Sequence, residues 1–153
     1  MRAKLLPSKS VIAVNSTVCS GCRMCELVCS TIHDNESNPN FSRIQVKRNP
    51  LNGPDFVPQI CLQCVEASCA KACPTGAIIS DEKSGTNARI VEKTLCIGCR
   101  ECIVACEAKI GSSRLRFDEQ NNVAFKCDIC EGEPQCVKYC PTGALTYVRL
   151  GTR

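Results

Sequence analysis

Four cysteines within residues 96–106 limit the possible folds of this chain more than any other feature. The stretch reads Cys96-Ile-Gly-Cys99-Arg-Glu-Cys102-Ile-Val-Ala-Cys106. In this spacing, three thiols on a tight loop can hold three corners of a cubane [4Fe-4S] cluster, whereas the fourth points toward a neighbouring cluster. One such run therefore predicts a partner run in the same protein.

Three further runs supply such partners, and the four runs together contain all sixteen cysteines of the chain. The second and fourth runs end alike in Cys-Pro-Thr-Gly-Ala, where the proline turns the chain away after the cysteine. We predict that every thiol is a cluster ligand. The four runs are Cys19, Cys22, Cys25 and Cys29; Cys61, Cys64, Cys69 and Cys73; Cys96, Cys99, Cys102 and Cys106; and Cys127, Cys130, Cys136 and Cys140.

The composition indicates that clusters replace a conventional apolar core. The 153 residues include no Trp, two Tyr and four Phe. Because cluster binding then supplies folding energy, we expect the apoprotein to be largely unfolded. The formal net charge of +4 becomes about −4 once four oxidised clusters of about −2 each are counted. The basic balance therefore gives no argument for nucleic-acid binding.

The sequence contains no recognisable secretion signal or membrane span. The charged start, residues 1–7, is not followed by a long apolar run, and no window approaches the roughly 18 apolar residues of a span. Because few residues follow residue 148, we expect neither an anchor helix nor an added catalytic domain there. We expect a cytoplasmic protein, in which thiols at metal-ligand spacing are ligands rather than disulfides.

Structural zinc is the alternative from a different class of function. Four zinc ions would also use sixteen thiolates, and paired Cys-x2-Cys knuckles are typical of zinc sites. Zinc has no use, however, for a third thiol three residues after the second, as at Cys25 and Cys102. Analysis for iron and acid-labile sulfide separates the two possibilities.

Residues 11–80 and 88–149 indicate an internal duplication. With a shift of 77 residues, the cysteines of the first and third runs coincide, as do Gly21 with Gly98 and Arg23 with Arg100. The amides of both glycines are expected to donate to cluster sulfur. A short helix is expected to end at residue 34. Strands are expected at 11–14, 43–47, 56–57, 78–80, 88–91, 114–117, 123–125 and 145–148.

The first run matches the bacterial ferredoxin spacing. Its alternation with a Cys-x2-Cys-x4-5-Cys-x3-Cys-Pro run, twice over residues 11–149, resembles the four-cluster ferredoxin-like electron-transfer subunits. These include the β subunits of dimethyl sulfoxide reductase, formate dehydrogenase and nitrate reductase, and short soluble relatives in tungsten aldehyde oxidoreductase complexes. The resemblance implies an α+β fold for the single compact chain 1–153. Two pseudo-symmetric bacterial-ferredoxin-like units of short strands and short helices would surround four [4Fe-4S] clusters.

The same resemblance implies how the runs combine. The first run would pair with the fourth and the second with the third, although spacing alone also allows the first with the second and the third with the fourth. The implied ligand sets are Cys19, Cys22, Cys25 with Cys140; Cys127, Cys130, Cys136 with Cys29; Cys61, Cys64, Cys69 with Cys106; and Cys96, Cys99, Cys102 with Cys73.

The implied function is a non-catalytic relay of single electrons between a catalytic oxidoreductase subunit and another redox partner, such as a flavoprotein subunit or a ferredoxin. A tungsten- or molybdenum-pterin subunit of the aldehyde-oxidising type is the first candidate, followed by a hydrogenase or formate dehydrogenase. The alternative is a free, diffusible polyferredoxin, which co-purification with a large subunit would exclude. Head-to-tail association of copies into a wire is a further hypothesis, tested by size exclusion.

Few other residues indicate a specific chemical role from the sequence alone. His33, the only histidine, is expected at the surface or at a helix end rather than as a ligand. Arg23 and Arg100 are either surface residues or groups that raise a cluster potential or dock a partner. Glu26 fits an exposed acidic face as well as a proton-coupling role. No nucleotide, flavin or nucleophile motif is present.

Overall fold

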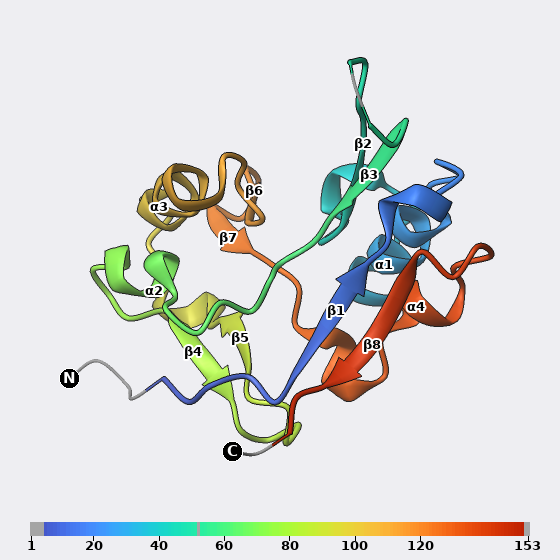
Figure 1. Ribbon diagram of the computed structural model, residues 1–153. Coiled ribbons are helices and arrows are strands. Elements are labelled where there is room, and N and C mark those ends of the chain that lie inside the picture. Colours follow the sequence, from blue (N-terminus) through green and yellow to red (C-terminus); the bar gives the residue numbers. More distant parts are fainter. Residues whose placement is uncertain (1–4, 52, 152–153) are drawn as a thin grey trace.

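The computed structural model describes residues 5–51 and 53–151. The charged start at residues 1–4, and residue 52 in the return between two predicted strands, lie outside the described residues. Within the described part the chain forms short helices and two-stranded antiparallel sheets (Figure 1). The helices are α1 (Met24–Asp34), α2 (Ser68–Ala72), α3 (Glu101–Ile110) and α4 (Gln135–Lys138). The strands are β1 (Ser10–Val14), β2 (Gln45–Arg48), β3 (Phe56–Gln59), β4 (Ile78–Asp81), β5 (Ala88–Val91), β6 (Arg116–Asp118), β7 (Val123–Phe125) and β8 (Leu145–Arg149).

Two similar units make up the fold, which confirms the predicted α+β class. In one unit, β1 pairs with β8 from Ser10↔Arg149 to Val14↔Leu145, and α1 packs against α4. In the other, β4 pairs with β5 across the predicted tip at 80–87, and α2 packs against α3. Figure 1 shows these two groups side by side, with β1 and β8 beside α1 and α4. The ends of the described chain therefore belong to one unit and its middle to the other.

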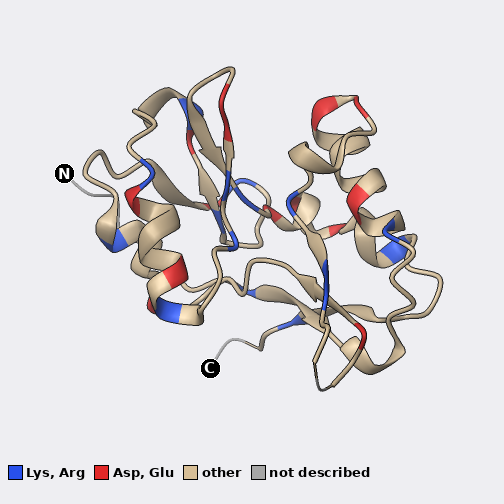
Figure 2. Ribbon diagram, turned by 90° about the horizontal axis from the view of Figure 1, so that it is seen from above, with Lys and Arg blue, Asp and Glu red and all other residues tan. Residues whose placement is uncertain are grey.

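A hairpin accompanies the long helix of each unit. The β2–β3 hairpin follows α1, and the shorter β6–β7 hairpin follows α3. The predicted strands at 43–47 and 114–117 begin two residues too early, because the serine-containing segments before β2 and β6 fold into turns, described below. Figure 2 shows that charged residues of both signs are distributed over both units.

The loops that lead into the two long helices, α1 and α3, contain residues with a left-handed backbone conformation. Gly21 and Gly98 have φ of 71° and 72°, and the residues that precede the helices, Arg23 and Arg100, have φ of 58° and 63°. A Cβ on Gly21 would lie 2.6 Å from the ring of Phe56. Glycine at this position is therefore required both by the left-handed backbone and by the close approach of β3.

The interior consists of small apolar side chains and thiols. One buried group contains Ile12, Ile44, Ile129 and Leu145 together with five cysteines, and the other contains Ile78 and Leu115 together with three. The cysteines thus occupy the positions that large apolar residues fill in an ordinary domain of this size.

Candidate cluster-binding site

Three cavities are each lined by four cysteines, three from one run and one from another. In each case the fourth cysteine comes from the run that packs in the same unit. The three sets are Cys19, Cys22, Cys25 and Cys140; Cys61, Cys64, Cys69 and Cys106; and Cys73, Cys96, Cys99 and Cys102.

The four remaining cysteines also lie close together. Burial first, and then the thiolate charges of Cys29 and Cys130, raise the pKa of Cys136. Burial and, among other groups, Cys136 raise the pKa of Cys127. These couplings indicate that Cys29, Cys127, Cys130 and Cys136 are neighbours, as in the fourth set that the resemblance implies.

The four sets follow one another in a row. After burial and its own neighbours, the next charge to raise the pKa of Cys136 is that of Cys25, which belongs to the first set. After burial, the charge that most raises the pKa of Cys127 is that of Cys61, and the charge that most raises the pKa of Cys102 is that of Cys69. Each end of the row holds one exposed cysteine, Cys22 or Cys99, whereas every cysteine of the two inner sets is buried or half-buried.

Burial raises the pKa of seven of these thiols, those of Cys25, Cys29, Cys69, Cys102, Cys127, Cys130 and Cys136. It is the main reason that the pKa of Cys25 and of Cys102 rises to about 12, and that of Cys130 to about 11. Such a thiol becomes a thiolate only when a cation replaces its proton. For Cys73, hydrogen bonds from Thr75 and nearby amides outweigh the effect of burial and lower the pKa.

Backbone amides already point at several of the sulfurs. The amides of Arg43 and Arg114 donate to the Sγ atoms of Cys29 and Cys106 at 3.2 and 3.4 Å. Three more amides do the same: Gln63 to Cys61, Ala77 to Cys73 and Ile129 to Cys127, at 3.3–3.4 Å. Amide donors of this kind stabilise a ligated thiolate and tune the potential of a cluster. Four thiols around each cavity, with donors aimed at the sulfur, are a donor set that fits a [4Fe-4S] cluster.

Comparison with known proteins identifies the family. Residues 54–150 match the family model described as a 4Fe-4S dicluster domain. The chain belongs to this 4Fe-4S dicluster family. It is 39% identical, over 84% of this chain and 70% of the relative, to the aliphatic sulfonate oxidoreductase polyferredoxin-like subunit of Pyrococcus furiosus. It is 33% identical to the thiosulfate reductase electron transfer subunit PhsB of Salmonella typhi, over 95% of this chain and 78% of that one.

Solved structures agree with this assignment. The active site complex BamBC of benzoyl coenzyme A reductase, as isolated, contains a chain with a TM-score of 0.51 and 28% sequence identity to this one. The match covers 91% of this chain and 76% of that chain. The predicted resemblance to iron-sulfur electron-transfer subunits and the predicted [4Fe-4S] cofactors are thereby confirmed. No helix in the described part of this dicluster protein is both long enough and apolar enough to cross a bilayer.

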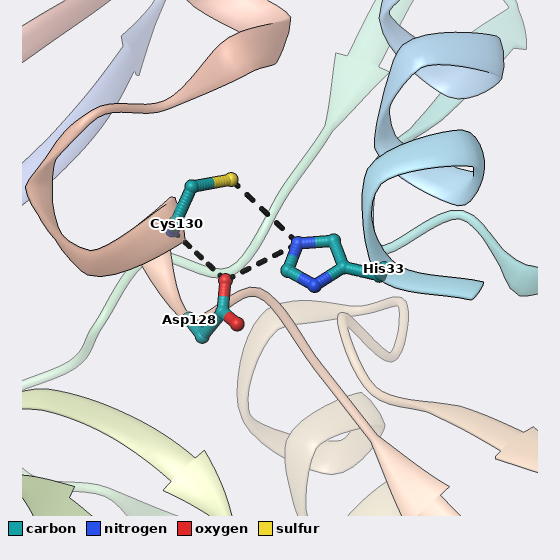
Figure 3. A group of neighbouring side chains, drawn as sticks. All are labelled: His33, Asp128 and Cys130. Atoms are coloured by element: carbon teal, nitrogen blue, oxygen red, sulfur yellow. Dashed lines mark hydrogen bonds and ion pairs between the residues drawn. The ribbon is translucent and has the colours of Figure 1, made fainter. Parts of the chain in front are cut away.

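His33 lies beside a cluster cysteine, a position that the sequence did not predict. It sits in the last turn of α1, as expected, but its Nε2 atom is 3.6 Å from Cys130 Sγ and 3.4 Å from Asp128 Oδ1 (Figure 3). Burial lowers the pKa of His33 more than the charge of Asp128 raises it. A neutral imidazole can donate one hydrogen bond here. Because Cys130 already belongs to a four-thiol set, we assign His33 to the surroundings of that set rather than to a separate metal site.

Glu26 and the two loop arginines, Arg23 and Arg100, make specific contacts in the structure. Glu26 is 3% exposed, so the acidic-face interpretation is wrong for this residue; its Oε1 accepts a 2.6 Å hydrogen bond from the Val46 amide. Arg23 pairs with Glu26 at 3.6 Å. Arg100 pairs with Glu119, and its guanidinium lies 3.9 Å from the centroid of the Phe117 ring. Both arginines have half-exposed side chains, as the surface interpretation predicts.

Proposed function

We propose that this chain is the electron-transfer subunit of an oxidoreductase complex and carries one [4Fe-4S] cluster in each of the four cysteine sets. The single observation that carries the proposal is the row of four-thiol sets with an exposed cysteine at each end and none in between. The packing of α1 on α4 and of α2 on α3 supports the pairing of the first run with the fourth and of the second with the third. The duplicated segments 11–80 and 88–149 would then exchange their last ligands.

Each group of residues has a distinct task in such a relay. A bound cluster supplies one-electron chemistry with little rearrangement of its surroundings. The chain's own cysteines fix the four positions in a row, and the amides of residues such as Arg43 and Arg114 orient the fourth thiol of the inner sets. Burial excludes water from the inner positions, whereas Cys22 and Cys99 mark where a partner can approach.

The partner is proposed from chemistry and resemblance together. A catalytic oxidoreductase subunit would exchange electrons at one end, and a flavoprotein subunit or ferredoxin at the other. A tungsten- or molybdenum-pterin subunit of the aldehyde-oxidising type stays our first candidate for the catalytic partner. The names of the relatives, which are subunits of sulfonate and thiosulfate oxidoreductases, support a catalytic partner in general. The non-catalytic role and a cytoplasmic location are parts of the same proposal.

Anaerobic purification of the native protein tests the proposal. We expect about 16 iron and 16 sulfide per chain, which corresponds to four cubane clusters, a brown colour that dithionite bleaches, and a large catalytic subunit that co-purifies. Zinc in place of iron would overturn the function. Full cluster content without a stable partner would favour the diffusible polyferredoxin, and filaments or large oligomers on size exclusion would favour the self-associating wire.

A further inference from the structure

Two cations are buried where the two units meet. Arg89 on β5 is 2% exposed and Lys126, just after β7, is 5% exposed. The Lys126 ammonium donates to the Arg89 carbonyl at 2.6 Å, and the Arg89 guanidinium donates to the carbonyls of Gln63 and Val65 at 3.3 and 3.1 Å. Gln63 in turn donates to the carbonyl of Cys127 at 3.0 Å. This network therefore connects the two inner cysteine sets.

Neither buried cation forms an ion pair among the described residues, and the one carboxylate on which Arg89 is seen to act, Glu66, is exposed and bonded to Lys71. No carboxylate lies within 4 Å of Arg89 or Lys126, and Arg89 Nε has no hydrogen-bond partner at all. Burying an unpaired cation is costly, and structures normally compensate for it with an opposite charge. Both residues line the cavity of Cys61, Cys64, Cys69 and Cys106. A bound cluster with four thiolates is the anion that this cavity would supply.

The other cavities are not surrounded in this way. The wall of the inner cavity also includes Arg114, whose Nε and Nη1 atoms are buried without a hydrogen-bond partner, and no acidic residue. The two end cavities each have one arginine in the wall, Arg23 or Arg100, and each of these is half-exposed and paired with a glutamate. The other inner set, that of Cys29, Cys127, Cys130 and Cys136, has Arg43 beside it, whose side chain is 10% exposed but is paired with Asp34. Positive charge that is both buried and unpaired is thus concentrated at one of the row's inner positions.

We propose that Lys126, together with Arg89, gives the cluster of Cys61, Cys64, Cys69 and Cys106 the highest reduction potential of the four. Reduction adds one negative charge, and a buried cation stabilises that added charge far more than an exposed, paired one does. The first electron to enter the protein then settles inside the row rather than at either exposed end. This inference rests on the proposed function, since it requires clusters in the four sets.

Arg89 has a structural role in addition to its charge, whereas Lys126 contributes mainly its charge. Arg89 holds the loop around Gln63, whose φ is 49°, through its guanidinium and through its amide, which donates to Gln63 Oε1 at 2.7 Å. Replacing Arg89 would disturb that loop. Among the described residues Lys126 makes one hydrogen bond, to the Arg89 carbonyl, so its charge can be removed with less change in structure.

The experiment is a reductive titration of the intact, cluster-loaded protein followed by electron paramagnetic resonance, with wild type, Lys126→Met and Lys109→Met compared. Lys109 is exposed and lines the same cavity, which makes it the matched control. In wild type, one cluster signal appears first. In Lys126→Met we expect the ratio of reduced to oxidised cluster for that signal to fall about tenfold at fixed potential, which equals about 59 mV for one electron. Lys109→Met should leave it nearly unchanged.

Two further variants keep the proposal testable. Lys126→Arg keeps the charge and should show the wild-type titration. Lys126→Gln removes the charge but can still donate to the Arg89 carbonyl, so it should behave like Lys126→Met. It replaces the methionine variant if that variant binds its clusters incompletely. If the first signal does not move in Lys126→Gln, or moves equally in Lys109→Met, the proposal is wrong. Absence of iron from the wild type would instead overturn the proposed function itself.

Discussion

At the scale of single residues, the glycines of the cluster loops are the positions that tolerate a side chain least. Gly21 has a left-handed backbone and no room for a Cβ beside Phe56, whereas Gly111, at the end of α3, has φ of 78° and open space around it. Alanine at Gly111 should cost about 1 kcal/mol from backbone strain alone. Alanine at Gly21 must also displace the Phe56 ring, which adds on the order of 1–3 kcal/mol.

Denaturation of the two cluster-loaded variants in urea, with iron content as a second readout, measures this difference. Gly111→Ala serves as the control, because both substitutions share the same unfavourable φ. Equal losses of stability in Gly21→Ala and Gly111→Ala would show that the Phe56 ring moves aside without a loss of free energy. The contact that is attributed here to β3 would then have no energetic role.

At the scale of elements, the segments that lead into β2 and β6 are built alike. Ser42 Oγ donates to the Ile44 carbonyl at 2.6 Å and accepts from the Ile44 amide, and Ser113 does the same with Leu115. The turn aims the intervening amide, of Arg43 or Arg114, at the fourth cysteine of the run before it. Each turn therefore couples a hairpin to an inner cysteine set.

Removing the hydroxyl of Ser42 should weaken this coupling. Ser42 is fully buried, so Ser42→Ala leaves the amide and carbonyl of Ile44 without their partner and should cost about 1–3 kcal/mol. Ser37 is exposed and makes a hydroxyl contact with Thr31, so Ser37→Ala should change the free energy of unfolding by less than about 0.5 kcal/mol. A Ser42→Ala midpoint in urea no lower than that of Ser37→Ala would contradict this role for the turn.

The same turns show where prediction from sequence reaches its limit. The spacing of the cysteines predicted the cofactor, because it directly encodes ligand geometry, whereas the α+β class was implied by the family resemblance of the runs. Alternation placed most strands, but it began two of them too early, at Arg43-Ile44 and Arg114-Leu115, where hydrogen bonds of the preceding serines, Ser42 and Ser113, replace the strand ladder. The repeated Ser-Arg-aliphatic sequence was a visible signal for these turns. The surroundings of His33, Glu26, Arg89 and Lys126 depend on long-range packing, for which no short-range pattern exists.

At the scale of the whole molecule, the secondary structure is too sparse to stand without metal. The sheets of the described part have two strands each, of three to five residues, and isolated two-stranded sheets are marginal in water. Five of the twelve residues in one buried group and three of the eight in the other are cysteines. Cluster bonds, rather than apolar burial, must therefore contribute most of the folding free energy.

Removal of iron should consequently unfold the chain cooperatively. We expect anaerobic treatment with acid and a chelator to abolish the far-ultraviolet circular dichroism of the native protein, and iron with sulfide under reducing conditions to restore it together with the brown colour. Reduced apoprotein, kept free of disulfides, is the necessary control, because sixteen free thiols would otherwise cross-link. An apoprotein that keeps native-like dichroism and a cooperative thermal transition would contradict the argument, since the short sheets and apolar groups would then suffice. The physical reason for the expected outcome is that each set draws ligands from two distant runs, so the loss of one cluster also releases the contact between them.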